Sequence, residues 1–197
     1  MKVVDGLSLG PEHRRCLRPG EALTDSHGNT YPLPRFFYEV PTWAAAKELK
    51  LTPHFSLAEL ITVDCREASF LFRQSPLYVP CAVSVLARYL EEFRSRVDAP
   101  VYVSANGGYR SPSHQWDRMC PGAQASPHHW ASAADIYRIG DTWLDSGKSI
   151  ERHARIAASM GSEIFVRPFG AGQGHTDDHL HLDLGFLTLV PRGYCEL

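Results

Sequence analysis

The stretch Ser126-Pro-His-His-Trp-Ala-Ser-Ala-Ala-Asp135 and the later segment His179-Leu-His-Leu-Asp183 are the most informative parts of this sequence. The first contains His128 and Asp135 with six residues between them, and the second is a His-x-His. Two nitrogen ligands, one oxygen ligand and an open fourth position are typical of a catalytic zinc site. A structural zinc site uses four protein ligands, usually with cysteine pairs, and no cysteine adjoins either segment. The pattern therefore indicates a metal-dependent hydrolase.

The spacing within the second segment supports this interpretation. His179 and His181 are two residues apart in a predicted strand, so both side chains point to the same face of a sheet. Asp183 continues that face and is placed to orient a ligand imidazole. The residues just before Asp135 are small, which allows the backbone to approach an ion closely.

Composition and charge exclude several other classes of protein. Hydrophobic residues make up 44% and charged residues 21% of the 197 residues, as in ordinary soluble domains. A net charge of −2 provides no basic field for nucleic acid or an anionic membrane. No apolar run approaches the roughly 20 residues that cross a bilayer. We therefore expect a monomer that acts on a peptide and binds neither nucleic acid nor membrane.

The N-terminus and the cysteines bear on the compartment. The first eleven residues include an acidic residue and two glycines where a signal peptide has a long apolar stretch, so we expect a cytoplasmic protein. If the substrate lies in the cell wall, release by lysis or non-classical secretion is then needed. The five cysteines are widely spaced, with no Cys-x-x-Cys pair. They are expected to be free and mostly buried, and one disulfide among them remains an alternative.

The chain divides into an N-terminal arm or extension, residues 1–50, and a metallopeptidase domain, residues 51–197. The arm is frequently interrupted by proline and glycine, with a turn at residues 25–29 and a short strand or extended segment at 35–40. Its aromatic residues need a surface to pack against, so it is expected to lie over the main domain.

Within the main domain the pattern predicts helices first and short strands afterwards. A capping box at Ser56 and Glu59 opens a short helix, residues 80–97 form an amphipathic helix, and 149–160 form a second one with Ser149 as its cap. Strands are predicted at 100–105, 133–139, 163–166 and 179–184. We expect an α+β fold in which a small, mainly antiparallel sheet packs against helices and carries the zinc site on one face.

These residues resemble the D-Ala-D-Ala metallopeptidase superfamily, which includes VanY-type D,D-carboxypeptidases, phage L-alanyl-D-glutamate endopeptidases and the zinc domain of hedgehog signalling proteins. Its pattern Ser-x-His-x-x-Gly-x-Ala-x-Asp is matched over Ser126 to Asp135, except that Ala131 stands at the glycine position. Gly108-Tyr-Arg-Ser111 is similar to a second segment of the superfamily. His54-Phe-Ser-Leu-Ala-Glu-Leu60 is similar to the helix that opens the VanY-like subgroup. The resemblance covers about residues 52 to 186.

The resemblance implies a role for several of these residues. His128, Asp135 and His181 would bind zinc. His179 would lie beside the nucleophilic water. Arg110 would point at the substrate and polarise the scissile carbonyl or the developing oxyanion, a role that suits a fixed guanidinium.

For three further residues, Asp178, Ser126 and Trp130, the sequence allows more than one role. Related enzymes that end in Glu-x-x-His use the glutamate as general base, and Asp178 occupies that position, so Asp178 and His179 are both candidates for proton transfer. Ser126 and Trp130 are candidate substrate-binding residues, although Ser126 is also an ordinary turn residue and Trp130 is equally suited to the core.

The sequence therefore predicts a zinc peptidase, a hydrolase for a peptide bond that involves a D-amino acid, as in peptidoglycan stem peptides of the cell wall. Whether it acts as a carboxypeptidase or an endopeptidase stays open. One alternative is a metal-binding recognition module without catalysis, as in the hedgehog domain. Another is a non-haem iron enzyme, which also uses two histidines and one carboxylate. Retention of Arg110 together with Asp178 and His179 favours catalysis.

Overall fold

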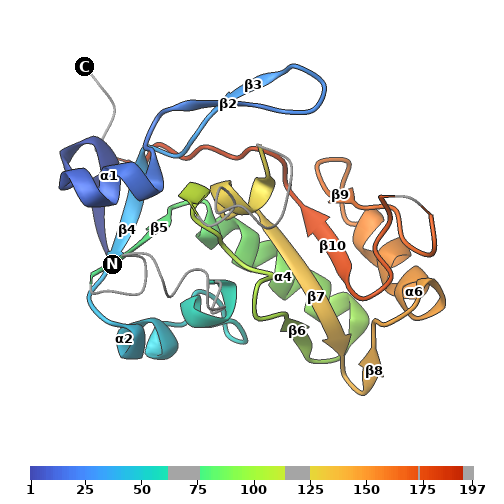
Figure 1. Cartoon of the computed structure of the whole chain (residues 1–197). Coiled ribbons are helices and arrows are strands. Elements are labelled where there is room, and N and C mark those ends of the chain that lie inside the picture. The colour runs from blue at the N-terminus through green and yellow to red at the C-terminus, as the bar shows by residue number, and fades with distance from the viewer. Residues whose placement is uncertain (62–75, 114–124, 173, 193–197) are drawn as a thin grey trace.

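The computed structural model describes residues 1–61, 76–113, 125–172 and 174–192, and Figure 1 shows how they are arranged. The strands are β1 (Lys2–Asp5), β2 (Ala22–Thr24), β3 (Thr30–Pro32), β4 (Phe36–Val40), β5 (Leu77–Pro80), β6 (Val101–Val103), β7 (Ala133–Ile139), β8 (Thr142–Trp143), β9 (Phe165–Val166) and β10 (Leu180–Asp183). The helices are α1 (Pro11–Leu17), α2 (Trp43–Glu48), α4 (Val83–Val97) and α6 (Gly147–Ala158), with short 3-10 helices η1 (Gly6–Ser8), η2 (Leu57–Leu60) and η4 (Pro127–Trp130).

The main sheet has the order β6-β7-β10-β9, and β8 pairs with β7 beyond this path. All pairings between its strands are antiparallel. Helix α4 runs along one face of the sheet (Figure 1), and its apolar residues Leu86, Leu90 and Phe93 are fully buried. They share one core with Ile136 of β7 and Leu180 of β10. Helices and antiparallel sheets in this arrangement confirm the predicted α+β class.

Two predicted helix starts were wrong. Pro80 does not begin the long helix, because it ends β5, where it pairs with Phe37 of β4, and the helix begins at Val83. Helix α6 begins at Gly147, and its N-cap is Ser146 instead of Ser149. Ser149 supplies the reciprocal hydrogen bond of the capping box, since its Oγ accepts from the Ser146 backbone nitrogen at 3.1 Å. Ser146 and Ser149 are three residues apart, and both take part in the capping box.

The N-terminal residues form a second sheet with the order β1-β4-β5. Strand β5 directly precedes α4 in the chain, so residues before and after position 50 contribute to the same sheet. Phe37 and Val40 of β4 are also buried in the same core as the α4 side chains. The predicted boundary near residue 50 stays a prediction, but the structure shows that the N-terminal sheet and α4 share one hydrophobic core.

The hairpin of β2 and β3 extends from this region (Figure 1), and Pro32 at its end accepts a hydrogen bond from Trp130 of η4. Its turn is closed by Asp25, whose Oδ1 accepts from the backbone nitrogens of His27 and Asn29 at 2.8 Å each. Tyr31 of the hairpin stacks on Phe186 with the ring centroids 3.8 Å apart. The hairpin is thereby packed against the segment that follows β10.

Within the described ranges no helix is both long and apolar enough to cross a membrane. Cys16 and Cys81 are free and buried, as expected. Burial raises the pKa of the Cys81 thiol to about 12. Cys65, Cys120 and Cys195 lie outside the described residues.

Candidate metal centre

Pairing of β7 with β10 brings the two informative segments of the sequence together. Asp135 and His181 are direct cross-strand partners in this antiparallel ladder, so their side chains leave the sheet on the same face. The two residues are 46 positions apart in the chain, and the Nδ1 of His181 lies 2.7 Å from the Oδ1 of Asp135. The face of the sheet that carries His181 therefore also carries Asp135, as the predicted zinc site requires.

His128 comes from η4, which precedes β7. Pro127 occupies the first turn of η4, and the helix ends at Ala131, whose backbone is left-handed with φ of 54°. Left-handed backbone favours glycine, which explains the glycine of the superfamily pattern at this position. Ala131 adopts the same conformation, and its backbone nitrogen donates to the His128 carbonyl at 3.2 Å. The turn between the first two predicted ligands is thus formed without the glycine.

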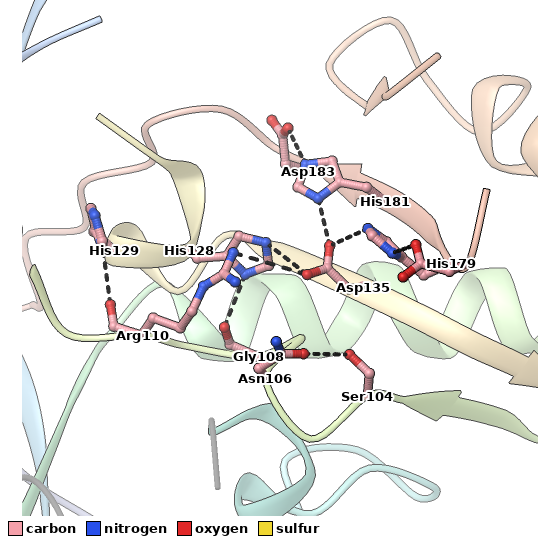
Figure 2. A network of polar contacts seen from close by, with 11 residues as sticks. Ser104, Asn106, Gly108, Arg110, His128, His129, Asp135, His179, His181 and Asp183 are labelled. Atoms are coloured by element: carbon pink, nitrogen blue, oxygen red, sulfur yellow. Dashed lines mark hydrogen bonds and ion pairs between the residues drawn. The ribbon is translucent and has the colours of Figure 1, made fainter. Parts of the chain in front are cut away.

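His128, Asp135 and His181 each offer one ligand atom, and these atoms lie within 4.8 Å of one another. All three side chains are buried. The Nε2 of His128 lies 3.3 Å from the Oδ2 of Asp135, and Figure 2 shows both imidazoles facing the carboxylate. The three predicted zinc ligands therefore converge on one point.

The hydrogen bonds of the two imidazoles decide which nitrogen faces that point. His128 Nδ1 donates to the Gly108 carbonyl at 2.9 Å, while its Nε2 is buried and has no hydrogen-bond partner among the described residues. His181 is held from the other side, because its Nε2 lies 3.0 Å from the Oδ2 of Asp183. Metal-binding histidines commonly use the second nitrogen in this way. The donor set and the unpaired Nε2 of His128 fit a zinc ion, and Asp183 has the orienting position that the sequence predicted.

The charges around the triad favour the metal-binding forms of Asp135 and His128, whereas they favour the protonated form of His181. Burial by itself raises the pKa of Asp135, but the imidazoles of His128 and His181 outweigh it and hold that pKa well below its usual value. Burial lowers the pKa of His128. Burial also opposes the protonation of His181, yet hydrogen bonds with Asp135 and Asp183 raise its pKa to about 9. Metal binding would therefore displace a proton from His181.

Two glycines let the preceding loop approach β7. A side chain at Gly107 would meet the backbone and Cβ of Asp135, and one at Gly108 would meet the backbone of Leu60. Instead, the Asp135 nitrogen donates to the Gly107 carbonyl at 2.9 Å, and the Tyr109 nitrogen donates to the Leu60 carbonyl at 2.7 Å. Both glycines are needed for this close backbone contact.

Asp178 and His179 form a pair beside the triad. The Nδ1 of His179 lies 2.6 Å from the Oδ1 of Asp178, and its Nε2 lies 3.6 Å from the Oδ1 of Asp135. The Asp178 side chain is 78% exposed, whereas that of His179 is 23% exposed. The imidazole therefore lies between the carboxylates of Asp178 and Asp135, and Figure 2 shows it facing Asp135. The sequence named both residues without ordering them, and the structure places His179 nearer the site.

Arg110 reaches the same carboxylate from the loop before η4. Its Nη2 lies 3.9 Å from the Oδ2 of Asp135, and its side chain is 18% exposed. The Arg110 nitrogen donates to the His128 carbonyl at 3.3 Å, and the His129 Nδ1 donates to the Arg110 carbonyl at 3.0 Å. His129 is buried, and its contact with the Arg110 backbone gives it a supporting position beside the site. No sequence pattern singled out this contact.

The two predicted substrate-binding residues have different positions. Trp130 is fully buried, its Nε1 donates to the Pro32 carbonyl at 2.8 Å, and its ring meets Phe186 edge-on. Trp130 is thus packed in the core and joins η4 to the β2–β3 hairpin, and its substrate-binding role stays a prediction. Ser126 is buried at the start of η4, and its substrate-binding role stays a prediction.

Ser132 is a further residue that the sequence did not single out. Its hydroxyl donates to the carbonyls of Pro127 and Gly185, which ties η4 to the end of β10. In the sequence, Ser132 stands out only as one of the small residues before Asp135. That position does not indicate a hydrogen bond to Gly185, which is 53 positions away.

Comparison with known proteins adds one match. A family model described as Peptidase M15 matches residues 53–183. The matched stretch contains the three converging ligands, Arg110, and the pair of Asp178 and His179. No curated protein and no solved structure matches the chain.

Proposed function

This chain belongs to the peptidase M15 family, as its motifs predicted, and we propose that it is a zinc-dependent peptidase for a bond that involves a D-amino acid. We further propose that its natural substrates are stem peptides of peptidoglycan or their fragments. Members of the VanY-like subgroup, which the sequence resembles, are carboxypeptidases, and this subgroup is part of the proposal.

The observation that carries the proposal is the position of His179. A metal site that only stabilises the fold or recognises a partner needs no proton acceptor beside its ligands. Here the Nε2 of His179 lies 3.6 Å from the Oδ1 of Asp135, and its other nitrogen is held by Asp178 at 2.6 Å. An imidazole oriented by a carboxylate next to a metal triad is the arrangement of a general base. This supports a catalytic site over a recognition module.

His128, Asp135 and His181 would hold the zinc ion. When bound, zinc supplies Lewis acidity and lowers the pKa of water to about 7. The role that we assign to His179 is to take a proton from the attacking water through Nε2 and to return it to the leaving amine. Asp178 keeps the Nδ1 proton of His179 directed away from the site and stabilises the imidazolium that forms.

Arg110 is assigned to the substrate carbonyl. Its guanidinium lies on the side of Asp135 that faces His128, and its backbone is held by two hydrogen bonds to the η4 segment. A cation that is fixed before the reaction stabilises developing negative charge without having to reorganise. Its permanent charge and planar fork suit an oxyanion better than the ammonium of a lysine.

The experiment that tests the proposal is incubation of the zinc-loaded protein with a library of peptidoglycan stem peptides. The library pairs each D-residue with its L-isomer, and mass spectrometry identifies the products. We expect cleavage next to a D-residue and none of the all-L peptides. Release of single C-terminal residues indicates a carboxypeptidase, and internal cleavage indicates an endopeptidase. Zinc binding without cleavage of any peptide would instead favour the recognition module.

A further inference from the structure

Four side chains form a cluster at the C-terminal end of β7, next to β8, and Figure 1 shows the position of this strand end. Arg138 is paired with Tyr102 of β6 on one side and with Trp143 of β8 on the other, so these three side chains share a face. An irregularity in the pairing next to Tyr102 brings Tyr137 to them, with its ring centroid 5.4 Å from that of Trp143. We refer to these four residues as the Arg138 cluster.

The Arg138 cluster lies on the face of the sheet that carries the metal centre. Val101 and Ile139 are paired neighbours of the cluster, and both are buried in the core that includes α4. Tyr102 follows Val101 and therefore points to the opposite face. Asp135 alternates with the core residue Ile136 in the same way. At about 3.3 Å per residue, Arg138 is about 10 Å along β7 from Asp135.

Arg138 contacts aromatic rings, and no anionic group among the described residues pairs with it. Its guanidinium carbon lies 3.9 Å from the ring centroid of Tyr102 and 5.6 Å from that of Trp143. Among the described residues it makes no hydrogen bond and no ion pair. Only its Nε is shielded from solvent, so the two terminal amino groups remain accessible. Trp143 itself is 57% exposed.

We propose that the Arg138 cluster is a subsite that binds a carboxylate of the peptide substrate, two to four residues from the scissile bond. This inference rests on the proposed function, because it takes the metal centre as the point of cleavage. Contact with the Tyr102 ring restricts the guanidinium, so less conformational freedom is lost when its terminal amino groups form a bidentate pair with a carboxylate. The rings of Tyr137 and Trp143 provide an apolar flank for the side chain that bears this carboxylate.

The test uses the zinc-loaded protein and a set of cleavable peptides in which one glutamate is moved through successive positions. Each peptide has a partner with glutamine at that position, and each is made with a free and with an amidated C-terminus, which separates a side-chain carboxylate from a terminal one. We expect kcat/KM to be about 10- to 100-fold higher for the carboxylate at one position, the range for hydrogen bonds to charged groups.

Three variants define the source of the preference. Arg138→Gln should reduce it to less than about threefold, mainly through KM, while the neutral peptides are cleaved as by the wild type. Arg138→Lys keeps a cation without the planar fork and should retain only part of the preference. Arg155→Gln, which removes an exposed arginine on α6, is the matched control and should change nothing.

The outcomes separate this subsite from the proposed function. Equal cleavage of carboxylate and neutral peptides by the wild type overturns the subsite and leaves the peptidase intact. If no peptide is cleaved, the affinities of the wild type and Arg138→Gln for the same peptides are measured by calorimetry. A carboxylate preference that Arg138→Gln abolishes then supports the subsite and overturns the peptidase, whereas equal binding overturns both. Loss of cleavage of every peptide by Arg138→Gln alone, with altered thermal unfolding, identifies the cluster as structural.

Discussion

The Nδ1 of His128 donates to the carbonyl of Gly108 at 2.9 Å, across 20 positions of the chain. This bond fixes the tautomer of the imidazole, so that the unpaired Nε2 is the atom directed at Asp135. Gly108 provides the acceptor because its backbone lies against that of Leu60, where a side chain would not fit. A backbone contact at Gly108 thereby orients one of the three candidate metal ligands.

The first prediction concerns metal content. The purified protein should contain about one zinc per chain, because three buried donor atoms converge within 4.8 Å. Alanine at His128, Asp135 or His181 should each abolish stable binding. Metal analysis of dialysed protein measures this, with His27→Ala in the exposed β2–β3 turn as the control. Full occupancy in all three ligand variants would show that zinc binds elsewhere, and iron in place of zinc would favour the non-haem iron alternative.

The second prediction concerns Arg110. Arg110→Ala should keep the fold and the zinc but lose about 2.7–4 kcal/mol of transition-state stabilisation, the usual scale for one oxyanion donor. Arg110→Lys should restore little, since an ammonium does not reproduce the planar fork. The measurement is kcat/KM on a cleavable stem peptide, with zinc content determined in parallel. An unchanged kcat/KM in the alanine variant would remove Arg110 from the mechanism.

The third prediction orders Asp178 and His179. His179→Ala should lower kcat by roughly 10²–10⁴ with zinc retained, because the imidazole is the nearer proton acceptor. Asp178→Asn should cost less, about 10- to 100-fold, since Asp178 acts through His179. The double variant should be no slower than His179→Ala, as expected for groups that act as a unit. Wild-type rates in both single variants would place the base elsewhere and favour the recognition module.

The fourth prediction concerns His129, whose Nδ1 holds the Arg110 carbonyl at 3.0 Å. His129→Leu should lower kcat about 10- to 100-fold with zinc retained, because the backbone that carries the guanidinium loses its support. His129→Asn should recover most of the rate, since its amide nitrogen occupies nearly the same place as Nδ1. A merely structural role would predict equal loss in both variants, or loss that follows thermal stability.

The fifth prediction concerns the pH dependence of stability at the N-terminal sheet. Hydrogen bonds from Arg35 lower the pKa of Asp5 below its ordinary value of 3.8, and the Nη2 to Oδ2 distance is 2.7 Å. A lowered pKa in the folded state stabilises the protein above pH 3.8, and this stabilisation is lost as pH falls through the folded pKa. Asp5→Asn should therefore lower the free energy of unfolding by about 1 kcal/mol or less at pH 7, since both side chains keep contact with solvent.

Urea unfolding at pH 7 and near pH 3 measures this difference. The gap between Asp5→Asn and the wild type should shrink as the pH approaches 3. Glu92→Gln serves as the control, because it removes an exposed i,i+4 partner of Arg96 and should change stability by only a few tenths of a kcal/mol. A gap that stays constant with pH would show that the charge of Asp5 is not what stabilises this contact.

The sequence by itself was sufficient to name the three candidate metal ligands and most of the elements around them. A residue spacing of two on a strand places His181 and Asp183 on one face wherever that strand lies, and the capping box at Ser56 closes the same turn in any fold. The strand at Ala133–Ile139 was predicted with its observed bounds. These features depend on residues within a few positions of one another, so local periodicity and hydrogen bonding are sufficient to predict them.

Only the tertiary structure decided the features that join distant parts of the chain. Trp130 is a core residue because its indole meets the Pro32 carbonyl 98 positions earlier, and nothing near Trp130 in the sequence indicates that acceptor. His179 lies closer to Asp135 than Asp178 does. This follows from the register in which β10, which begins at the next residue, pairs with β7. Arg138 shares the face of the metal centre for the same reason, through pairing with β6 and β8. Which side chains meet across a sheet depends on strand pairing, and the free energy that selects the pairing comes from burial of the whole core.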